Sequence, residues 1–122
     1  MKKKILLVDD EPDIRLLMTA RLNYMGYDVV TAGDGQEGLN LARKESPDLI
    51  LLDLMLPKLD GYKVCRMLKF DKAYGHIPVV IFSSRGSEED KKLAAEVGAD
   101  GYMIKPFQEQ ELVSTLQKFF GA

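Results

Sequence analysis

The fold of this chain is decided by Asp48-Leu49-Ile50-Leu51-Leu52-Asp53-Leu54-Met55-Leu56-Pro57. Its central run, residues 49–52, is wholly apolar and stands before the turn signals Pro57 and Asp60-Gly61. A run this short does not make a core helix and is typical of a strand that is buried on both faces. Asp53 ends the run, and a buried carboxylate is costly unless a neighbouring group needs its charge. Taken alone, Asp53 is more typical of a loop residue that caps the following helix, so the rest of the chain must decide.

Length and composition indicate one globular domain over residues 1–122, since the chain is 46% hydrophobic and 30% charged. The net charge of −2 gives no electrostatic footprint for nucleic acid, and no apolar run approaches the roughly 20 residues of a membrane span. The basic start resembles a signal peptide, but Asp9-Asp10-Glu11 ends its apolar part early. The single Cys65 lies in an amphipathic stretch and is expected to be a packed thiol. We therefore expect no nucleic-acid partner, no membrane, and a reducing cytoplasm.

Short apolar runs alternate with helical patterns along the whole chain. Strands are expected at 4–8, 27–32, 49–52, 78–82 and 101–104, and helices at 12–25, around 38–42, around 64–68, at 87–97 and at 109–120. Such alternation predicts right-handed crossovers and a parallel sheet that helices cover on both faces. We therefore expect an α/β fold, a flavodoxin-like doubly wound (βα)5 unit. Its strand order should be 2-1-3-4-5, the commonest arrangement for five such units.

Polar residues collect where the predicted strands end. The first strand is followed by Asp9-Asp10 and the third by Asp53, while the fourth reaches Ser83 and the fifth Lys105. All carboxyl ends of a parallel sheet share one edge, and strands one and three are neighbours at the switch point where ligands bind in such folds. Three carboxylates, a hydroxyl and an ammonium should therefore converge there.

The chemistry of this set points to phosphoryl transfer. Close carboxylates repel one another, and a divalent cation relieves that repulsion. Hard oxygen ligands without His or Cys select Mg²⁺ or Mn²⁺ over Zn²⁺. Asp53 would then be the nucleophile that forms an acyl phosphate. The metal and Lys105 would neutralise the phosphoryl oxygens, and Ser83 would donate a hydrogen bond.

In these motifs the chain resembles the CheY-like, single-domain receivers of two-component response regulators. The resemblance covers the whole chain. It rests on Val8–Glu11, Leu52–Pro57 with Asp60-Gly61, Pro78–Ser84, and Gly98–Asp100 leading to Lys105–Phe107. It also implies the strand order given above. It implies a protein that takes a phosphoryl group from a histidine kinase or phosphotransfer protein and then changes its affinity for a partner.

The resemblance assigns roles to individual residues at the acidic edge. It implies that Asp53 is the phosphoacceptor. It implies that Asp10, Asp53 and the backbone carbonyl of Met55 ligate Mg²⁺, with Asp9 acting through a water molecule. A cis peptide bond at Lys105-Pro106 is common in the family and is expected here.

The resemblance also implies a switch and an output face. Ser83 takes the place of the family's switch hydroxyl, which is more often Thr, and Tyr102 matches the switch aromatic. The face altered by phosphorylation would be the fourth helix, fifth strand and fifth helix, about residues 88–118. Many transcription-factor receivers dimerise there through a charged pattern, which is incomplete here at Asp100-Gly101 and Ser114-Thr115. We therefore expect a monomer or weak dimer and an unknown protein target.

Other functions are weighed against this one. A haloacid dehalogenase-like phosphatase would carry a second Asp two residues after the nucleophile, where this chain has Met55, so we expect no enzyme. A flavin-binding module should offer hydroxyls and backbone N–H groups to a phosphate after the first strand, where Asp9-Asp10-Glu11 would instead repel that phosphate. A receiver that only mediates contacts would be expected to have lost charged site residues, and this chain retains them. Taken alone, Asp9-Asp10-Glu11 is typical of a helix cap, Ser83-Ser84 of a turn and Lys105 of a solvated lysine. Only their predicted convergence with Asp53 favours the functional interpretation.

Overall fold

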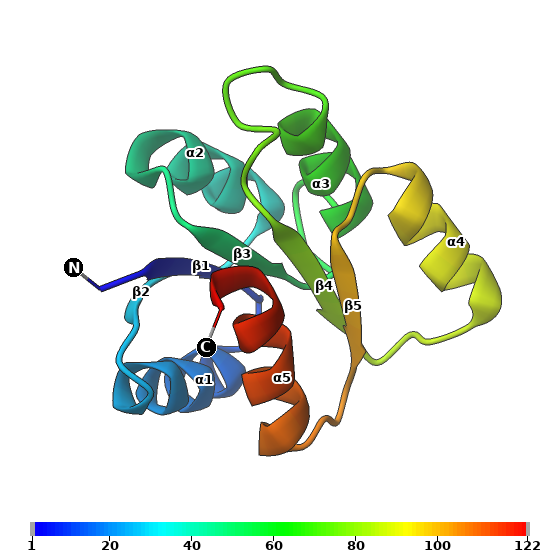
Figure 1. Cartoon of the computed structure of the whole chain (residues 1–122). Coiled ribbons are helices and arrows are strands. Elements are labelled where there is room, and N and C mark those ends of the chain that lie inside the picture. The colour runs from blue at the N-terminus through cyan, green and yellow to red at the C-terminus, as the bar shows by residue number, and fades with distance from the viewer. Residues whose placement is uncertain (1, 122) are drawn as a thin grey trace.

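The computed structural model describes residues 2–121, in which strands and helices alternate (Figure 1). The strands are β1 (Lys4–Val8), β2 (Asp28–Ala32), β3 (Leu49–Leu52), β4 (Val79–Ser83) and β5 (Gly101–Ile104). The helices are α1 (Pro12–Tyr24), α2 (Gly35–Glu45), α3 (Gly61–Lys69), α4 (Glu88–Glu96) and α5 (Glu109–Phe120).

The strands form one parallel sheet in the order β2-β1-β3-β4-β5, which confirms the predicted flavodoxin-like fold. The register aligns the ends of β1 and β3, while β4 continues beyond its last pairing with β3 to Ser83. Val8 lies opposite Leu52, and Leu52 lies opposite Ile81. Because β1 and β3 end side by side, the residues that follow them must start from the same point of the sheet edge.

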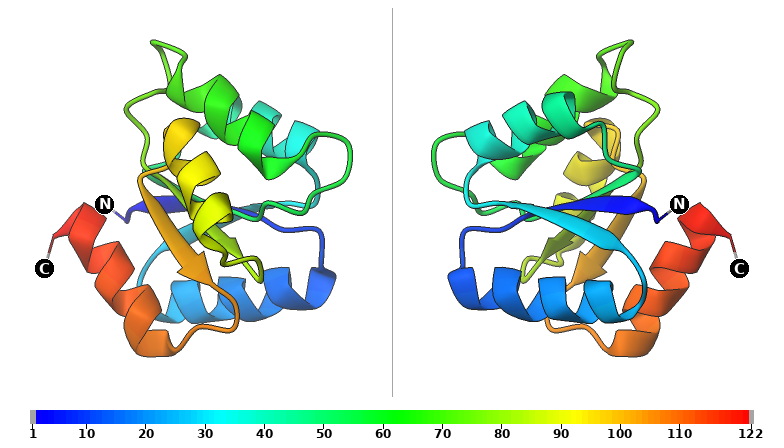
Figure 2. Two further views of the ribbon diagram at one scale, coloured as in Figure 1. Left: turned by 90° about the vertical axis from the view of Figure 1, so that its right-hand side faces the viewer. Right: turned by 90° about the vertical axis from the view of Figure 1, so that its left-hand side faces the viewer.

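Helices cover both faces of the sheet, with α1 and α5 on one face and α2 and α3 on the other, while α4 flanks β4 and β5 (Figures 1 and 2). This explains the unbroken apolar run of β3. Leu49 and Leu51 pack toward α1 and α5, whereas Ile50 and Leu52 pack toward α2 and α3. All of these side chains are fully buried. Strand β3 is therefore the centre of both cores, as its composition predicted.

Side-chain caps fix where three of the helices begin. The Asp34 carboxylate accepts from the Glu37 N–H at 2.8 Å at α2, and the Asp60 carboxylate accepts from the Lys63 N–H at 3.0 Å at α3. The Ser87 hydroxyl accepts from the Asp90 N–H at 3.0 Å at α4. Such caps satisfy backbone donors that the helix cannot pair. They hold the loops that follow β2, β3 and β4 in place.

Several predicted boundaries shift by one residue: β4 is Val79–Ser83 rather than 78–82, α1 ends at Tyr24 rather than 25, and α4 is Glu88–Glu96 rather than 87–97. The second strand begins at Asp28 rather than Tyr27. The Tyr27 N–H donates to the Leu22 carbonyl at 3.1 Å, which closes the end of α1, and its ring packs against Phe120. Tyr27 therefore belongs to the turn, although its aromatic character suggests a strand. None of the helices within residues 2–121 combines the length and apolar character needed to cross a bilayer.

Candidate functional site

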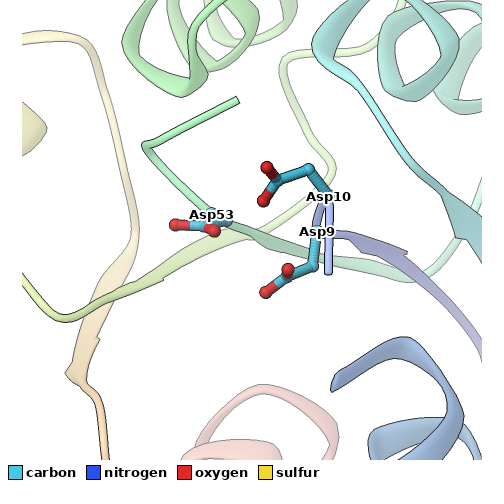
Figure 3. Close-up of side chains that lie close together, drawn as sticks. All are labelled: Asp9, Asp10 and Asp53. Atoms are coloured by element: carbon cyan, nitrogen blue, oxygen red, sulfur yellow. The ribbon is translucent and has the colours of Figure 1, made fainter. Parts of the chain in front are cut away.

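The structure brings Asp9, Asp10 and Asp53 together at the carboxyl edge of the sheet (Figure 3). The Asp53 N–H donates to the Val8 carbonyl at 3.0 Å, which extends the β1–β3 pairing by one step. One carboxylate oxygen from each of the three residues lies within 4.8 Å of the others. Three carboxylates from two points of the chain, the end of β1 and the end of β3, thus share one small volume.

Asp9 is fully buried and is tied from several sides. Its carboxylate accepts from the Glu11 N–H at 2.8 Å and from Lys105 Nζ at 2.9 Å. Its carbonyl accepts from Arg15 Nη1 at 2.7 Å. These bonds fix the carboxylate of Asp9, whereas Asp10 is exposed and free of such contacts among residues 2–121.

Asp53 is only 4% exposed. Its Oδ1 accepts from the Met55 N–H at 3.3 Å, and its Oδ2 lies 3.4 Å from Lys105 Nζ. Burial raises the pKa of Asp53, and although Lys105 opposes this, the charge of Asp9 adds to it. The ionised form of Asp53 is therefore less stable here than in water, and binding of a cation would stabilise it.

Lys105 reaches this cluster from the end of β5. Its N–H donates to the Ser83 carbonyl at 2.8 Å, and its Nζ lies 4.6 Å from the centre of the Phe82 ring. Burial by itself lowers the pKa of Lys105, but the hydrogen bond to Asp9 and the charges of Asp53 and Asp9 raise it overall. The ammonium is therefore a permanent positive charge. The bond between Lys105 and Pro106 is cis, as expected.

The donor set fits a hard divalent cation. Three carboxylates face one ammonium, so negative charge remains in excess, and the cluster contains neither His nor Cys. Oxygen-only donors of this kind are preferred by Mg²⁺ and Mn²⁺. The Met55 side chain is exposed, and its N–H is already used by Asp53.

Ser83 and Tyr102 both contact the loop between β4 and α4. The Ser83 side chain is fully buried, and its Oγ accepts from the Arg85 N–H at 3.2 Å. The Tyr102 hydroxyl donates to the Arg85 carbonyl. One loop residue is thus held by both residues that the sequence assigned to a switch.

Sequence reasoning missed several residues around this edge. A Cβ on Gly61 would overlap the Asp53 carbonyl and would lie 2.7 Å from Leu54 Cα, so only glycine lets α3 start this close to the site. The Asp60-Gly61 pair was a visible turn signal, but nothing in it named its neighbour. Arg85 and Asp90 were also missed, because their mutual contact is a feature of the loop fold.

Similarity to known proteins agrees with this geometry. Residues 5–117 match the family model described as the response regulator receiver domain. This chain belongs to that family. It is 50% identical to the alkaline phosphatase synthesis transcriptional regulatory protein PhoP of Bacillus subtilis over 112 residues, which are 92% of this chain and 46% of PhoP. The chain spans about half the length of the curated relatives it matches.

Solved receiver structures superpose closely on this chain. The chemotaxis protein CheY4 of Vibrio cholerae has a TM-score of 0.92 at 33% identity, covering 98% of this chain and 100% of that one. The receiver domain of the sensor histidine kinase PA1611 of Pseudomonas aeruginosa has a TM-score of 0.91 at 30% identity, and the match covers 100% of both chains. The latter is described with a magnesium ion coordinated in its active-site cleft. The chain is therefore a receiver domain of two-component signalling.

Proposed function

We propose that this receiver, taken as one domain over residues 1–122, accepts a phosphoryl group on Asp53 in a Mg²⁺-dependent reaction. The observation that supports this most is the buried Asp53 carboxylate beside Lys105, with two further acids within 4.8 Å. A carboxylate placed only for stability would not be surrounded by others of its own charge.

In the proposed reaction one Asp53 oxygen forms a bond to phosphorus. The bond between phosphorus and the imidazole nitrogen of the donor protein's phosphohistidine breaks, and its electron pair stays on that nitrogen. Lys105 Nζ, which already lies 3.4 Å from Asp53 Oδ2, would neutralise a phosphoryl oxygen. The Met55 N–H would continue to orient the carboxylate through Oδ1.

Asp10, Asp53 and the Met55 carbonyl would hold Mg²⁺ or Mn²⁺, with Asp9 acting through water. The bound ion would supply the positive charge that brings an anionic donor to an acidic cleft. Asp9 suits an indirect role, because its two carboxylate oxygens accept hydrogen bonds at 2.8 and 2.9 Å, whereas those of Asp53 are held more loosely, at 3.3 and 3.4 Å.

Ser83 and Tyr102 would report the phosphoryl group to the protein surface. The buried Ser83 hydroxyl contacts the backbone N–H of Arg85, and the Tyr102 hydroxyl contacts the backbone carbonyl of the same residue. Moving Ser83 toward a phosphoryl oxygen would change the support of that loop. Two conformations whose balance the phosphoryl group alters are sufficient for such a switch.

A histidine kinase or phosphotransfer protein in the cytoplasm would be the donor, and a protein target would bind the α4–β5–α5 face. Asp100 at this face is held by Lys69 at 2.8 Å, which leaves it less available for an intermolecular ion pair. We therefore expect a monomer or weak dimer. Sedimentation with Mg²⁺ and beryllofluoride, in which fluorides stand in for phosphoryl oxygens, would contradict this by showing a tight dimer.

The site itself is tested with Asp53→Asn and a small phosphodonor such as acetyl phosphate with Mg²⁺. Intact mass spectrometry should show one added phosphoryl group on the wild type and none on the variant. Asp28→Asn, at an exposed carboxylate on the opposite edge of the sheet, is the matched control and should be labelled normally. Labelling of Asp53→Asn at another residue would show that the nucleophile is wrong.

A further inference from the structure

A buried carboxylate outside the acidic cluster has no role in the reaction described above. Asp90 is 7% exposed, and the other buried polar side chains of residues 2–121 are Asp9, Asp53 and Ser83, which all belong to the site. Asp90 lies in the first turn of α4. Burial of a charged group is costly unless it is paired, so the contacts of Asp90 indicate what it does.

Asp90 joins three segments. Its Oδ1 accepts from the Tyr62 hydroxyl at 3.1 Å and lies 2.9 Å from Arg85 Nη2, while its Oδ2 accepts from the Ser87 hydroxyl at 2.7 Å. Tyr62 belongs to α3 and Arg85 to the loop after β4. A helix cap alone needs only the contact to Ser87, so the contacts to Tyr62 and Arg85 serve another purpose.

Arg85 stands at the wall of the phosphorylation cleft. Its side chain is about half exposed, and its Nη1 lies 3.7 Å from the sulfur of Met55, two residues after the phosphoacceptor. Arg85, Met55, Tyr62 and Asp10 line one cavity of about 580 Å³. A permanently charged guanidinium thus borders the same space as an acid of the cluster, and its partner Asp90 holds it at that border.

The pair has an electrostatic consequence for the cleft. While Asp90 holds Arg85, the guanidinium charge is neutralised, and the excess of carboxylates remains open to a cation. An Arg85 released from Asp90 would be attracted by that excess. It would weaken the binding of a divalent cation, and its planar fork suits the oxygens of a phosphoryl group.

We propose that Asp90 is a positioning residue that keeps Arg85 out of the phosphorylation cleft. Opening of the Arg85–Asp90 pair turns the guanidinium into the cleft, where it competes with the divalent cation and attracts an anionic phosphodonor. This inference rests on the proposed function of the cleft at Asp53.

The first test is calorimetric titration of the whole chain with Mg²⁺. Asp90→Asn keeps the shape of the side chain and should weaken Mg²⁺ binding roughly three- to tenfold, the range expected when one nearby charge is freed beside a doubly charged ion. Glu89→Gln changes the net charge equally at an exposed neighbour on α4 and should leave the affinity within about twofold.

The decisive comparison adds Arg85→Gln. Because the weakening is attributed to the freed guanidinium, Asp90→Asn should no longer weaken Mg²⁺ binding when Arg85 is already Gln. At saturating Mg²⁺, acetyl phosphate should label Asp90→Asn several-fold faster than the wild type, and this gain should also vanish with Arg85→Gln. A purely structural role in starting α4 would produce neither dependence on Arg85.

Two results would overturn the proposal. These are an unchanged Mg²⁺ affinity in Asp90→Asn, or a weakening that persists without Arg85. If either occurs while the wild type binds Mg²⁺ and is labelled, only the role of Asp90 fails; a wild type that binds no Mg²⁺ would overturn the proposed function as well. Should Asp90→Asn not fold, Tyr62→Phe removes one contact that orients Asp90 and should give a smaller weakening with the same dependence on Arg85.

Discussion

A lysine is paired with carboxylate at each end of the strands, the amino edge and the carboxyl edge of the sheet, but the ratio of negative to positive charge differs between the two. At the amino edge, Lys69 Nζ lies 2.8 Å from Asp100 and donates to the Ile77 carbonyl at 3.0 Å. The same Asp100 oxygen accepts from the Val79 N–H at 2.9 Å. At the carboxyl edge, Lys105 is shared between Asp9 and Asp53, and Asp10 adds a further charge.

This difference is the one expected between a structural ion pair and the site that we propose binds a cation and a phosphoryl group. The Lys69–Asp100 pair is balanced one to one, and it joins α3 to the starts of β4 and β5. The acidic cluster is unbalanced, and burial raises the pKa of Asp53. Excess like charge destabilises the protein by itself, so it is expected where a bound ion or group restores the balance.

The largest predicted effect comes from removing each lysine. Lys105→Met leaves the fully buried Asp9 without its counter-ion and should lower the free energy of unfolding by about 3 kcal/mol without Mg²⁺. Lys69→Met should cost about 1–2 kcal/mol, since Asp100 is more exposed and can be hydrated. Urea denaturation measures both.

Mg²⁺ distinguishes the two edges in the same experiment. Added Mg²⁺ should recover part of the loss in Lys105→Met, because the ion also neutralises the acidic cluster, and it should recover none in Lys69→Met. Equal responses of both variants would contradict the assignment of a metal site to the carboxyl edge.

The next prediction uses one substitution type at both edges. Asp53→Asn should stabilise the metal-free protein by about 1 kcal/mol, because it removes a buried charge from an excess, and Asp10→Asn should act in the same direction. Asp100→Asn should instead destabilise by about 1–2 kcal/mol, because it breaks a balanced pair. Thermal unfolding at neutral pH with chelator present tests the opposite signs.

The effect of Asp53→Asn should depend on pH and on the metal. A raised pKa in the folded state means that the native protein binds a proton more readily than the unfolded chain, so stability due to Asp53 rises as pH falls through that pKa. The stability advantage of Asp53→Asn over the wild type should therefore shrink on acidification.

At a hundredfold excess over its dissociation constant, Mg²⁺ should stabilise the wild type by about 2.7 kcal/mol and the Asp53→Asn variant by less. Equal shifts would contradict the site.

The smallest effect is expected at Cys65, beside the balanced pair. Its thiol is fully buried and donates to the Val97 carbonyl at 3.5 Å, and burial raises its pKa to about 12. A thiol reagent should therefore not modify the folded protein at mildly alkaline pH, but should modify it fully in urea. Rapid modification without denaturant would show that this region opens. The buried position agrees with the packed thiol that the sequence predicted.

Sequence reasoning predicted the parallel sheet and the gathering of Asp9, Asp10, Asp53 and Lys105 because both depend on chain order, whereas the strand order 2-1-3-4-5 was predicted from the commonest arrangement and from the family resemblance. Apolar runs of strand length alternate with helical patterns, and parallel strands end at one edge. It placed Tyr27 in a strand wrongly, since an aromatic residue suits a strand and the closing bond to Leu22 cannot be read from the chain.

The sequence by itself thus determined the fold, the family and the residues at the acidic edge, because periodicity and strand-end chemistry are local properties of the chain. Only the tertiary structure decided how their charges are paired. Lys69 with Asp100, Asp90 with Arg85, and Gly61 against the Asp53 backbone are contacts between segments that lie 31, 5 and 8 residues apart. Even the two pairs that are close in sequence depend on the path of the loop between them and on how the helices pack against the sheet. No pattern of neighbouring residues predicts these contacts.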